Sequence, residues 1–367
     1  MREVRHVVVV GGGVAGCATA HYLSAAGVAV TLVEREGLAA GASGWSAGGL
    51  NPLYGVPEGL AAFAMASYRE HLRLWPEIER LTGQALGGRI IDMALVASTE
   101  AEIAPLQATA AAFAAADGFS ARWLNRAELL AHEPRIASHV AGGLLTRGNG
   151  VVDSEHFTKL LAAAAQAQGA TVRAGTVTGV QHTDQIVTGV VLDDGTIPCD
   201  AVVIATGPWS DAATAWLGYS VPVEPLKGEI VRVAPIGPPL AFDVVTPAVS
   251  LFSRVDGQVW IGATQEKRGF DREVTTEAHD LLRGAAADLM PSLADATLVQ
   301  QTACLRPISP DGMPILGAVP GWSGAFLATA AGTKGILLAP AMARAVADLI
   351  VTGTTAVPLD GCSPARY

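Results

Sequence analysis

The sequence predicts an α/β protein in which a Rossmann-like dinucleotide-binding domain is interleaved with a second domain built on a mostly antiparallel sheet. Three observations support this fold class. The first 34 residues follow the order strand, glycine-rich turn, helix, strand. From Thr171 onward short strands with hairpin signals appear, and further strand-like runs occupy residues 223–263. Near the end, a strand over Gly324–Ala331 and a helix over Gly335–Val351 return to the α/β pattern.

The opening unit has the layout of a dinucleotide-binding motif. An apolar strand over Val7–Val10 leads into Gly11-x-Gly13-x-x-Gly16, and a helix and second strand then end at Glu34. Gly11 permits the tight turn, Gly13 lets backbone approach a pyrophosphate, and Gly16 lets the helix pack close to the strand. The helix N-terminus offers N–H groups and a partial positive charge to phosphates. Glu34 can accept hydrogen bonds from an adenosine ribose, so we predict a bound dinucleotide.

The composition describes a well-buried globular chain that is long enough for two cores. It has 367 residues, of which 50% are hydrophobic and 16% charged. A net charge of −10 and the absence of basic runs argue against nucleic acid or an anionic membrane surface as a partner. No signal-peptide pattern and no long apolar stretch occurs, so we expect a cytoplasmic protein. Four widely spaced cysteines form neither a disulfide framework nor a metal site.

The remaining elements suggest how the two domains alternate. Residues 57–83 and 100–117 carry helical patterns, and Cys199–Gly207 reads as a buried strand that joins the parallel sheet and ends near the cofactor. We expect the cofactor domain to comprise residues 1–82, 145–222 and 303–367, and the substrate domain residues 83–144 and 223–302.

Three further segments identify a family. They are Ala42–Leu50, Ala205–Ser210 and Leu305–Gly317. With the opening motif, these segments resemble the FAD-dependent D-amino-acid oxidase (DAO) family, and within it most closely the glycine oxidases. Leu226–Glu229 and Ile261–Thr264 match strand segments of the substrate domain of that family. The resemblance covers nearly the whole chain.

The resemblance implies a glutathione-reductase-like FAD-binding domain that holds FAD in an extended pose. The adenosine would lie at Glu34, the pyrophosphate at Gly13–Gly16, and the isoalloxazine between the two domains. The positions that resemble FAD contacts in the family are Gly11, Gly13, Val14, Ala15, Gly16, Glu34, Arg35, Ser43, Ser46, Ala47, Val177, Ala205, Thr206, Gly207, Trp209, Arg306, Gly332, Thr333, Lys334 and Gly335.

The chain has no second glycine fingerprint that could hold NAD(P)H, so the substrate itself must reduce the flavin. This disfavours NADPH-driven monooxygenases, and the lack of a CxxC pair disfavours disulfide reductases. The resemblance implies oxidative deamination of a small amino acid, in which hydride leaves the α-carbon and the resulting imine hydrolyses. Arg306, in the family's Arg-Pro motif, would grip the substrate carboxylate through two parallel charge-assisted hydrogen bonds.

The expected substrate pocket departs from the glycine oxidases. We place Gly49, Phe252, Gln265 and Thr333 in the pocket. Phe252 lies on a strand where those enzymes carry a tyrosine, and Gln265 stands where they carry a methionine. The family's Gly-His-x-x-x-Gly reads Ala330–Gly335 here, without the histidine. These departures put glycine itself in doubt as the substrate.

Two alternatives stay open. Cys304 aligns with the cysteine that links flavin covalently in monomeric sarcosine oxidase, which would favour a secondary-amine substrate. The chain could also be the flavoprotein subunit of an amino-acid dehydrogenase complex. Oxygen or another acceptor would reoxidise the flavin, and Lys227 and Lys334 are the lysines whose charge could assist oxygen. A homo-oligomer is compatible with the sequence.

Overall fold

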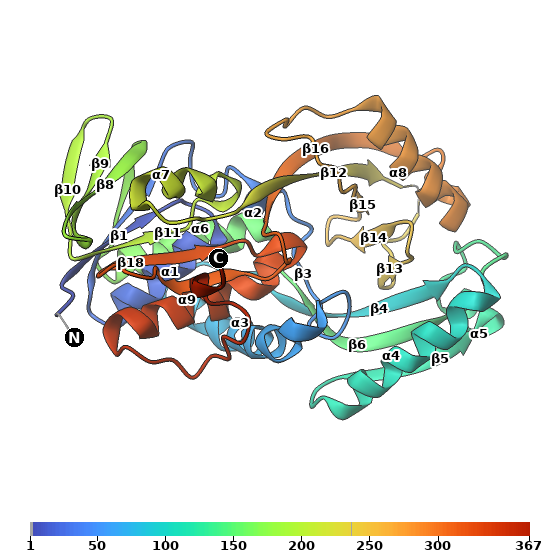
Figure 1. Cartoon of the computed structure of the whole chain (residues 1–367). Coiled ribbons are helices and arrows are strands. Elements are labelled where there is room, and N and C mark those ends of the chain that lie inside the picture. The colour runs from blue at the N-terminus through green and yellow to red at the C-terminus, as the bar shows by residue number, and fades with distance from the viewer. Residues whose placement is uncertain (1–2, 236) are drawn as a thin grey trace. The chain divides into compact units, whose positions relative to one another are not determined.

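The computed structural model describes residues 3–235 and 237–367, so Met1, Arg2 and Ile236, which fall within the expected domain ranges, lie outside the described residues. The chain divides into two compact units (Figure 1). The first unit contains residues up to Gly87, Val152–Leu226 and Leu305–Tyr367, and the second contains Gly88–Val151 and Lys227–Cys304. Each domain boundary expected from the sequence lies two to seven residues before the corresponding boundary between the two units. The assignment of FAD to the first unit and substrate to the second stays a prediction.

The first unit is built on a sheet with the strand order β17-β18-β11-β1-β2-β7. Strands β18, β11, β1, β2 and β7 run parallel, and β17 is antiparallel to β18. The strands are β1 (His6–Val10), β2 (Ala29–Glu34), β7 (Thr171–Ala174), β11 (Ala201–Ile204), β17 (Ile315–Ala318) and β18 (Ala325–Thr329). The predicted strand over Cys199–Gly207 is confirmed as β11, which pairs with β1 in parallel.

Both faces of this sheet are covered, which is why Val7, Val8 and Val9 are all fully buried although they point to alternate sides. In the view of Figure 1, α3 and α9 lie below the strands, and α7 with β8, β9 and β10 lies above them. The helices are α1 (Val14–Ala25), α2 (Ala42–Trp45), α3 (Ala61–Thr82), α6 (Ser154–Ala167), α7 (Ala213–Leu217) and α9 (Gly335–Val351). Helix α9 has the bounds expected from the sequence.

A small antiparallel sheet with the order β10-β9-β8 packs beside the main sheet. Its strands are β8 (Val177–Thr183), β9 (Ile186–Leu192) and β10 (Gly195–Pro198), and a two-residue strand, β3 (Gly49–Leu50), also belongs to the first unit. Val190 and Leu192 of β9 share one apolar core with Val8 and Ile204 of the main sheet. The predicted hairpins are therefore confirmed for β8, β9 and β10, whereas the predicted strand that begins at Thr171 is β7, which joins the parallel sheet instead.

Helix α9 contains an interior proline, and a residue of α3 supplies the hydrogen bond that this proline cannot make. Pro340 has no N–H group, so the carbonyl of Ile336, four residues earlier, lacks its helical donor. The buried His71 of α3 supplies it, with Nε2 at 2.9 Å from that carbonyl oxygen. Ser67 Oγ, one helical turn earlier on α3, accepts the N–H of Ala341 at 3.1 Å. These two bonds attach the first turns of α9 to α3.

The second unit is a sheet with the order β16-β12-β15-β14-β13-β4-β6, and β5 also pairs with β6. The pair β13 with β4 is parallel, whereas β12, β15, β14 and β13 form antiparallel neighbours, as do β4, β6 and β5. Its elements are β4 (Arg89–Ala97), α4 (Ile103–Ala115), β5 (Ser120–Asn125), α5 (Arg126–His132), β6 (Gly142–Val151), β13 (Asp243–Val245), β14 (Ser250–Ser253), β15 (Val259–Gly262) and α8 (Thr276–Leu289). Strands β12 (Glu224–Ala234) and β16 (Thr297–Ile308) run across a unit boundary.

The core of the second unit follows from strand alternation. Val231 on β12, Leu251 on β14 and Ile261 on β15 are fully buried in one apolar cluster with residues of α8. Alternate residues of the same strands point to the other face of the sheet, which carries Phe252 and Trp260. The prediction of a mostly antiparallel second sheet is confirmed.

Candidate functional site

The expected cofactor residues of the first unit gather at one edge of its sheet. Strands β1, β11 and β18 run parallel, so the segments that follow them leave the sheet on the same side. These segments are the glycine loop after β1, Ala205–Gly207 after β11 and Ala330–Gly335 after β18. Glu34 ends β2 at this edge. Segments that are far apart in the sequence therefore line one margin of the sheet.

The glycine loop is tightly packed against other backbone at Gly11 and Gly16, and it has space beside Gly13. Gly11 has a φ of +114°, and a Cβ there would lie 2.4 Å from the Ala205 carbonyl oxygen. A Cβ on Gly16 would lie 1.9 Å from the Gly11 carbonyl oxygen, so no larger residue fits. At Gly13 a Cβ would meet only Ser43 Oγ, at 3.3 Å. Gly11 and Gly16 thus permit backbone packing, whereas Gly13 leaves space for another group.

The N-terminus of α1 offers hydrogen-bond donors to that space. Gly13 is its N-cap and has no side chain with which to cap the helix. Ser43 Oγ accepts the N–H of Val14 at 2.9 Å, so one expected cofactor residue supports another. Within the described ranges, the N–H groups of Ala15 and Gly16 have no acceptor. These donors and the helix dipole suit the oxygens of a pyrophosphate.

Glu34 is fixed against the glycine loop. Its Oε2 accepts the N–H of Gly12 at 2.5 Å, and its Oε1 accepts the N–H of Glu36 at 2.8 Å. The carboxylate is half-buried and keeps further lone pairs for a ribose hydroxyl. Beside it, the guanidinium carbon of Arg35 lies 4.5 Å from the ring centroid of Trp209. This stack joins two expected cofactor residues that are far apart in the sequence.

The segment after β2 forms a scaffold of backbone and hydroxyl contacts. Ser46 Oγ accepts the N–H of Gly48 at 3.1 Å, and the Ser46 carbonyl accepts the Ser154 hydroxyl at 2.8 Å. Gly48 has a φ of +72°, and a Cβ there would lie 1.9 Å from the Val152 carbonyl oxygen. Next to these contacts, Ala47 and Gly49 are half-buried.

A buried hydroxyl cluster joins the ends of β11 and β18. Ser210 Oγ donates to the Gly207 carbonyl at 2.7 Å and lies 2.7 Å from Thr329 Oγ1 and 3.1 Å from Thr206 Oγ1. Ser210 and Thr329 are buried, whereas Thr206 and Gly207 are half-buried. Ser210 belongs to a recognised motif, but Thr329 carried no signal, because a threonine on a buried strand is ordinary.

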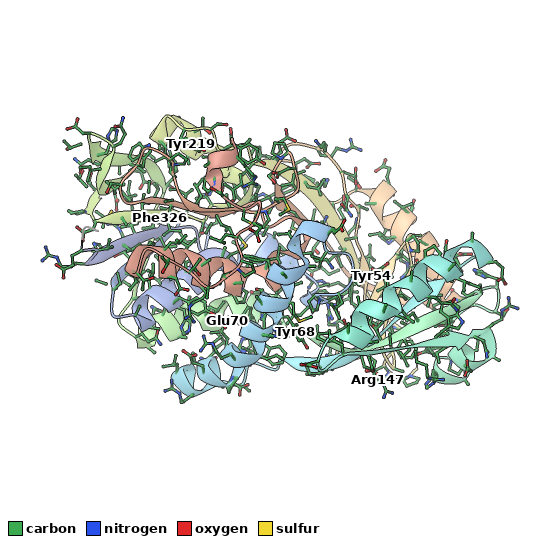
Figure 2. The ribbon with its side chains drawn as sticks, turned by 60° about the horizontal axis from the view of Figure 1, so that its bottom comes forward. Tyr54, Tyr68, Glu70, Arg147, Tyr219 and Phe326 are labelled. Carbon is green, nitrogen blue, oxygen red and sulfur yellow. The ribbon has the colours of Figure 1, made fainter. Side chains whose placement is uncertain are left out.

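The segment after β18 places Lys334 beside the residues that follow β3. Its Nζ donates to the Tyr54 carbonyl at 2.9 Å, and Tyr54 is labelled in Figure 2. The Lys334 side chain is half-buried, and desolvation lowers the pKa of its amine to about 8. Gly332 and Gly335 are half-buried, and Thr333 is exposed. At this sheet edge the lysine provides a positive charge that titrates near pH 8.

Arg306 is half-buried on β16, and hydrogen bonds to Asp311 hold the loop that follows this strand. Asp311 in that loop accepts from Ser309 Oγ at 2.9 Å, from the Tyr367 hydroxyl at 2.8 Å and from Arg366 Nε at 2.7 Å. Burial opposes the charge of Asp311, but the Arg366 guanidinium and the other donors outweigh it and hold the pKa of Asp311 well below its usual range. Asp311 is therefore a structural anchor of the loop after Arg306.

In the second unit, Phe252 leans along its strand toward Gly262. Phe252 pairs with Trp260, while Ser250 pairs with Gly262. A Cβ on Gly262 would lie 3.8 Å from Phe252 Cε2 and 3.0 Å from Ile230 Cγ1. Ser250 is therefore the residue directly opposite Gly262, and the sequence did not single it out. The edge of the Phe252 ring therefore lies beside Gly262.

Gln265 is exposed just beyond β15, between the buried Thr264 and the half-buried Glu266. Three other sequence candidates lie on β8, β16 and β12. Val177 is half-buried in β8, and Cys304 is buried on β16, two residues before Arg306. Lys227 is fully buried and ion-paired with Asp271.

Among residues 3–235 and 237–367, no cluster of three or more His, Cys, Asp or Glu side chains could hold a metal ion. Over the same residues, no helix combines the length and apolar character required to cross a membrane.

The geometry of the first unit fits FAD. The open space at Gly13, the donor groups at the start of α1 and the fixed carboxylate of Glu34 match a pyrophosphate followed by a ribose. The glycine loop would hold the pyrophosphate and Glu34 the ribose, while Lys334 and the start of α9 provide positive charge at the same sheet edge.

Comparison with known proteins agrees with this geometry. Residues 6–349 match the model of the family described as DAO, FAD dependent oxidoreductase. The chain is 34% identical over 356 residues to a glycine oxidase of Pseudomonas aeruginosa, covering 94% of each chain. It is 29% identical to a D-amino acid dehydrogenase of Methylobacterium nodulans, covering 98% of this chain and 99% of the relative.

Among solved structures, the glycine oxidase of Geobacillus kaustophilus superposes with a TM-score of 0.93 at 30% identity, covering 99% of both chains. The family resemblance and the FAD cofactor expected from the sequence are thereby confirmed. The chain belongs to the DAO family of FAD-dependent oxidoreductases.

Proposed function

We propose that this protein oxidises a small amino acid at its α-carbon, giving an imine that water hydrolyses. Bound FAD supplies the hydride acceptor for this reaction. The protein has to bind the carboxylate, orient the α-carbon and receive the amine in its unprotonated form. Similarity to glycine oxidases over nearly the full chain supports this reaction class.

The observation that carries the proposal is the setting of Arg306. Its guanidinium belongs to a half-buried side chain on β16, directly before the loop that Asp311 anchors. A planar guanidinium in partial burial can hold a carboxylate through two parallel hydrogen bonds and so fix the direction of the α-carbon. Lysine would keep the charge but lose this geometry.

The residues of the second unit proposed to contact the substrate side chain are Phe252 and Gln265. Gln265 offers a donor and an acceptor from an exposed position, and Phe252 offers an aromatic face beside Gly262. Such a pocket accepts a small polar substituent better than a purely apolar pocket does. We therefore propose a small amino acid other than glycine as the preferred substrate.

An anaerobic titration of the purified yellow protein tests this function. Glycine, sarcosine, proline and small D- and L-amino acids are added separately while the flavin absorbance band is followed, and air is then admitted. We expect one class to bleach the band. Arg306→Lys and Arg306→Met should raise the substrate concentration for half-bleaching by about 100-fold or more, since each loses the bidentate pair. If no amino acid bleaches the flavin of the wild-type protein, the proposal is wrong.

The return of colour in air distinguishes two acceptors. Fast recovery indicates an oxidase that uses oxygen, and slow recovery indicates a dehydrogenase that passes electrons to another acceptor. The similarity to a D-amino acid dehydrogenase keeps the second outcome as a specific candidate.

A secondary-amine oxidase with covalent flavin is the second candidate function, and the position of Cys304 favours it. Cys304 is buried and lies two residues before Arg306, so both side chains point to the same side of β16. Acid denaturation tests the link. A yellow precipitate that becomes colourless in Cys304→Ala establishes covalent flavin, whereas release of all the flavin into the supernatant excludes it.

A further inference from the structure

A buried ion pair lies beneath the segment that follows β15 in the second unit. Lys227 and Glu229, two residues apart on β12, are both fully buried. The Lys227 ammonium lies 2.7 Å from Asp271 Oδ2 and 3.4 Å from Glu229 Oε1. Burial opposes the lysine charge, but Asp271 and Glu229 outweigh it and raise the pKa of Lys227. The ammonium is therefore neutralised locally and is not available as a charge for oxygen.

The Glu229 carboxylate also binds Thr275, at the end of the segment of residues 264–275 that follows β15. One carboxylate oxygen accepts the Thr275 hydroxyl at 3.0 Å, and the other accepts the Thr275 N–H at 3.0 Å and Gln301 Nε2 at 2.7 Å. Gln301 Nε2 also donates to the Thr275 carbonyl at 2.8 Å. Residue 275 is thus tied to both β12 and β16 through one carboxylate.

The start of the same segment is held by the backbone of β12. The Glu229 N–H donates to Thr264 Oγ1 at 3.0 Å, and Lys227 and Glu266 exchange two backbone hydrogen bonds of 2.9 Å. The backbone of Lys227 and Glu229 therefore holds residues 264 and 266, and the charged side chains of the same two residues hold residues 271 and 275. Gln265 lies between the two backbone-held residues with an exposed side chain.

We infer that Lys227 and Glu229 are positioning residues that hold the segment 264–275 so that the Gln265 side chain contacts the side chain of the substrate. The inference rests on the proposed function, which places Gln265 in the pocket. A buried pair of opposite charges is costly to desolvate, and apolar side chains of similar volume can stabilise a core equally well. What the charges add is direction, because their hydrogen bonds fix the far part of the segment at Asp271 and Thr275, while backbone bonds fix its start at residues 264 and 266.

The test uses the FAD-loaded full chain and five variants, the fifth being the double variant with Gln265→Ala added. Lys227→Met removes the ammonium, and the double variant Lys227→Met with Glu229→Gln leaves no unpaired buried charge and should fold even if the single variant does not. Gln265→Ala removes the presented side chain. The matched control is Arg135→Met, which breaks another strong pair of the second unit, at 2.6 Å to the buried Glu133, without touching the segment.

Three quantities are measured: the FAD content per chain, the amide exchange rate of residues 264–275, and the dissociation constant and limiting rate of anaerobic flavin reduction by the preferred amino acid. We expect the double variant to retain FAD, to exchange faster in this segment, and to bind substrate about tenfold more weakly with a nearly unchanged limiting rate. Adding Gln265→Ala to the double variant should weaken binding little further, because both changes remove the same contact. Arg135→Met should lower the melting temperature without these effects.

Two results overturn the inference. If the segment exchanges no faster in the double variant than in Arg135→Met, the ion pair does not hold it. If the segment loosens and Gln265→Ala weakens binding, but the double variant binds substrate normally, the network has only a structural role. Failure of the proposed function looks different, because then no amino acid reduces the wild-type flavin, and the exchange rates still decide whether the pair holds the segment.

Discussion

The contact between His71 and the proline-interrupted helix α9 allows a stability prediction by a double-mutant cycle. His71→Leu replaces the imidazole by an apolar side chain of similar size in a site with no solvent exposure, and it leaves the Ile336 carbonyl without a donor. An unpaired buried backbone acceptor costs about 1–3 kcal/mol, so we expect a loss of about 2 kcal/mol in the free energy of unfolding. The loss of the ring contact with Phe157, whose centroid lies 5.0 Å away, adds a smaller amount.

Pro340→Ala supplies the second side of the cycle. The alanine introduced by this substitution would carry an N–H that can donate to the Ile336 carbonyl in the ordinary helical pattern. In this background His71→Leu should therefore cost about 1 kcal/mol less than in the wild-type chain, which is a coupling energy well above the error of additivity.

The assay is urea unfolding of the wild-type protein, both single variants and the double variant, followed by far-UV circular dichroism at one fixed excess of FAD. The constant FAD concentration keeps the contribution of cofactor binding equal in all four proteins. Additive effects, with a coupling energy below about 0.3 kcal/mol, would refute the reasoning that His71 replaces the donor that Pro340 lacks.

Three other changes test separate parts of the structure. Burial lowers the pKa of His71 from 6.5 to about 4, so between these pH values the unfolded chain binds a proton that the folded chain does not. The free energy of unfolding should therefore be highest above pH 6.5 and fall by about 3 kcal/mol toward pH 4. Unfolding curves of His71→Leu should lack this pH dependence. Gly16→Ala would place a Cβ 1.9 Å from the Gly11 carbonyl, so we expect purified protein with little FAD, whereas Gly284→Ala, with open space on α8, should bind FAD normally. Because the pKa of Lys334 is lowered to about 8, its charge is present below that pH and lost above it; if it assists turnover, the rate should decline above pH 8 in the wild type and show no such decline in Lys334→Met.

Local patterns were sufficient to predict strands β1, β2, β11 and β18 of the first unit's sheet, but not β17 or the place of β7 beside β2. The alternation of apolar strand, glycine turn and helix predicted β1, α1 and β2, and the buried run before Ala205 predicted the parallel strand β11. The same patterns predicted α9 from Gly335 to Val351. These predictions succeed because strand and helix periodicity and the space required by glycine depend on residues close together in the sequence.

Contacts between distant residues needed the tertiary structure. No spacing indicates that Arg35 stacks on Trp209 or that Arg366 anchors Asp311. Likewise, Phe252 was selected from its strand, but only the register showed that Ser250 is the residue opposite Gly262.

The sequence by itself determined the order of the main elements, because strand and helix periodicity and the glycine turn depend on neighbouring residues, and the resemblance of four segments identified the family and its FAD cofactor. Only the tertiary structure showed that Lys227 is a buried partner of Asp271 and Glu229, whereas Lys334 keeps a titratable charge at the sheet edge. The physical reason is that a lysine's role depends on its desolvation and on the charges around it, and both are set by segments that meet only in the folded chain.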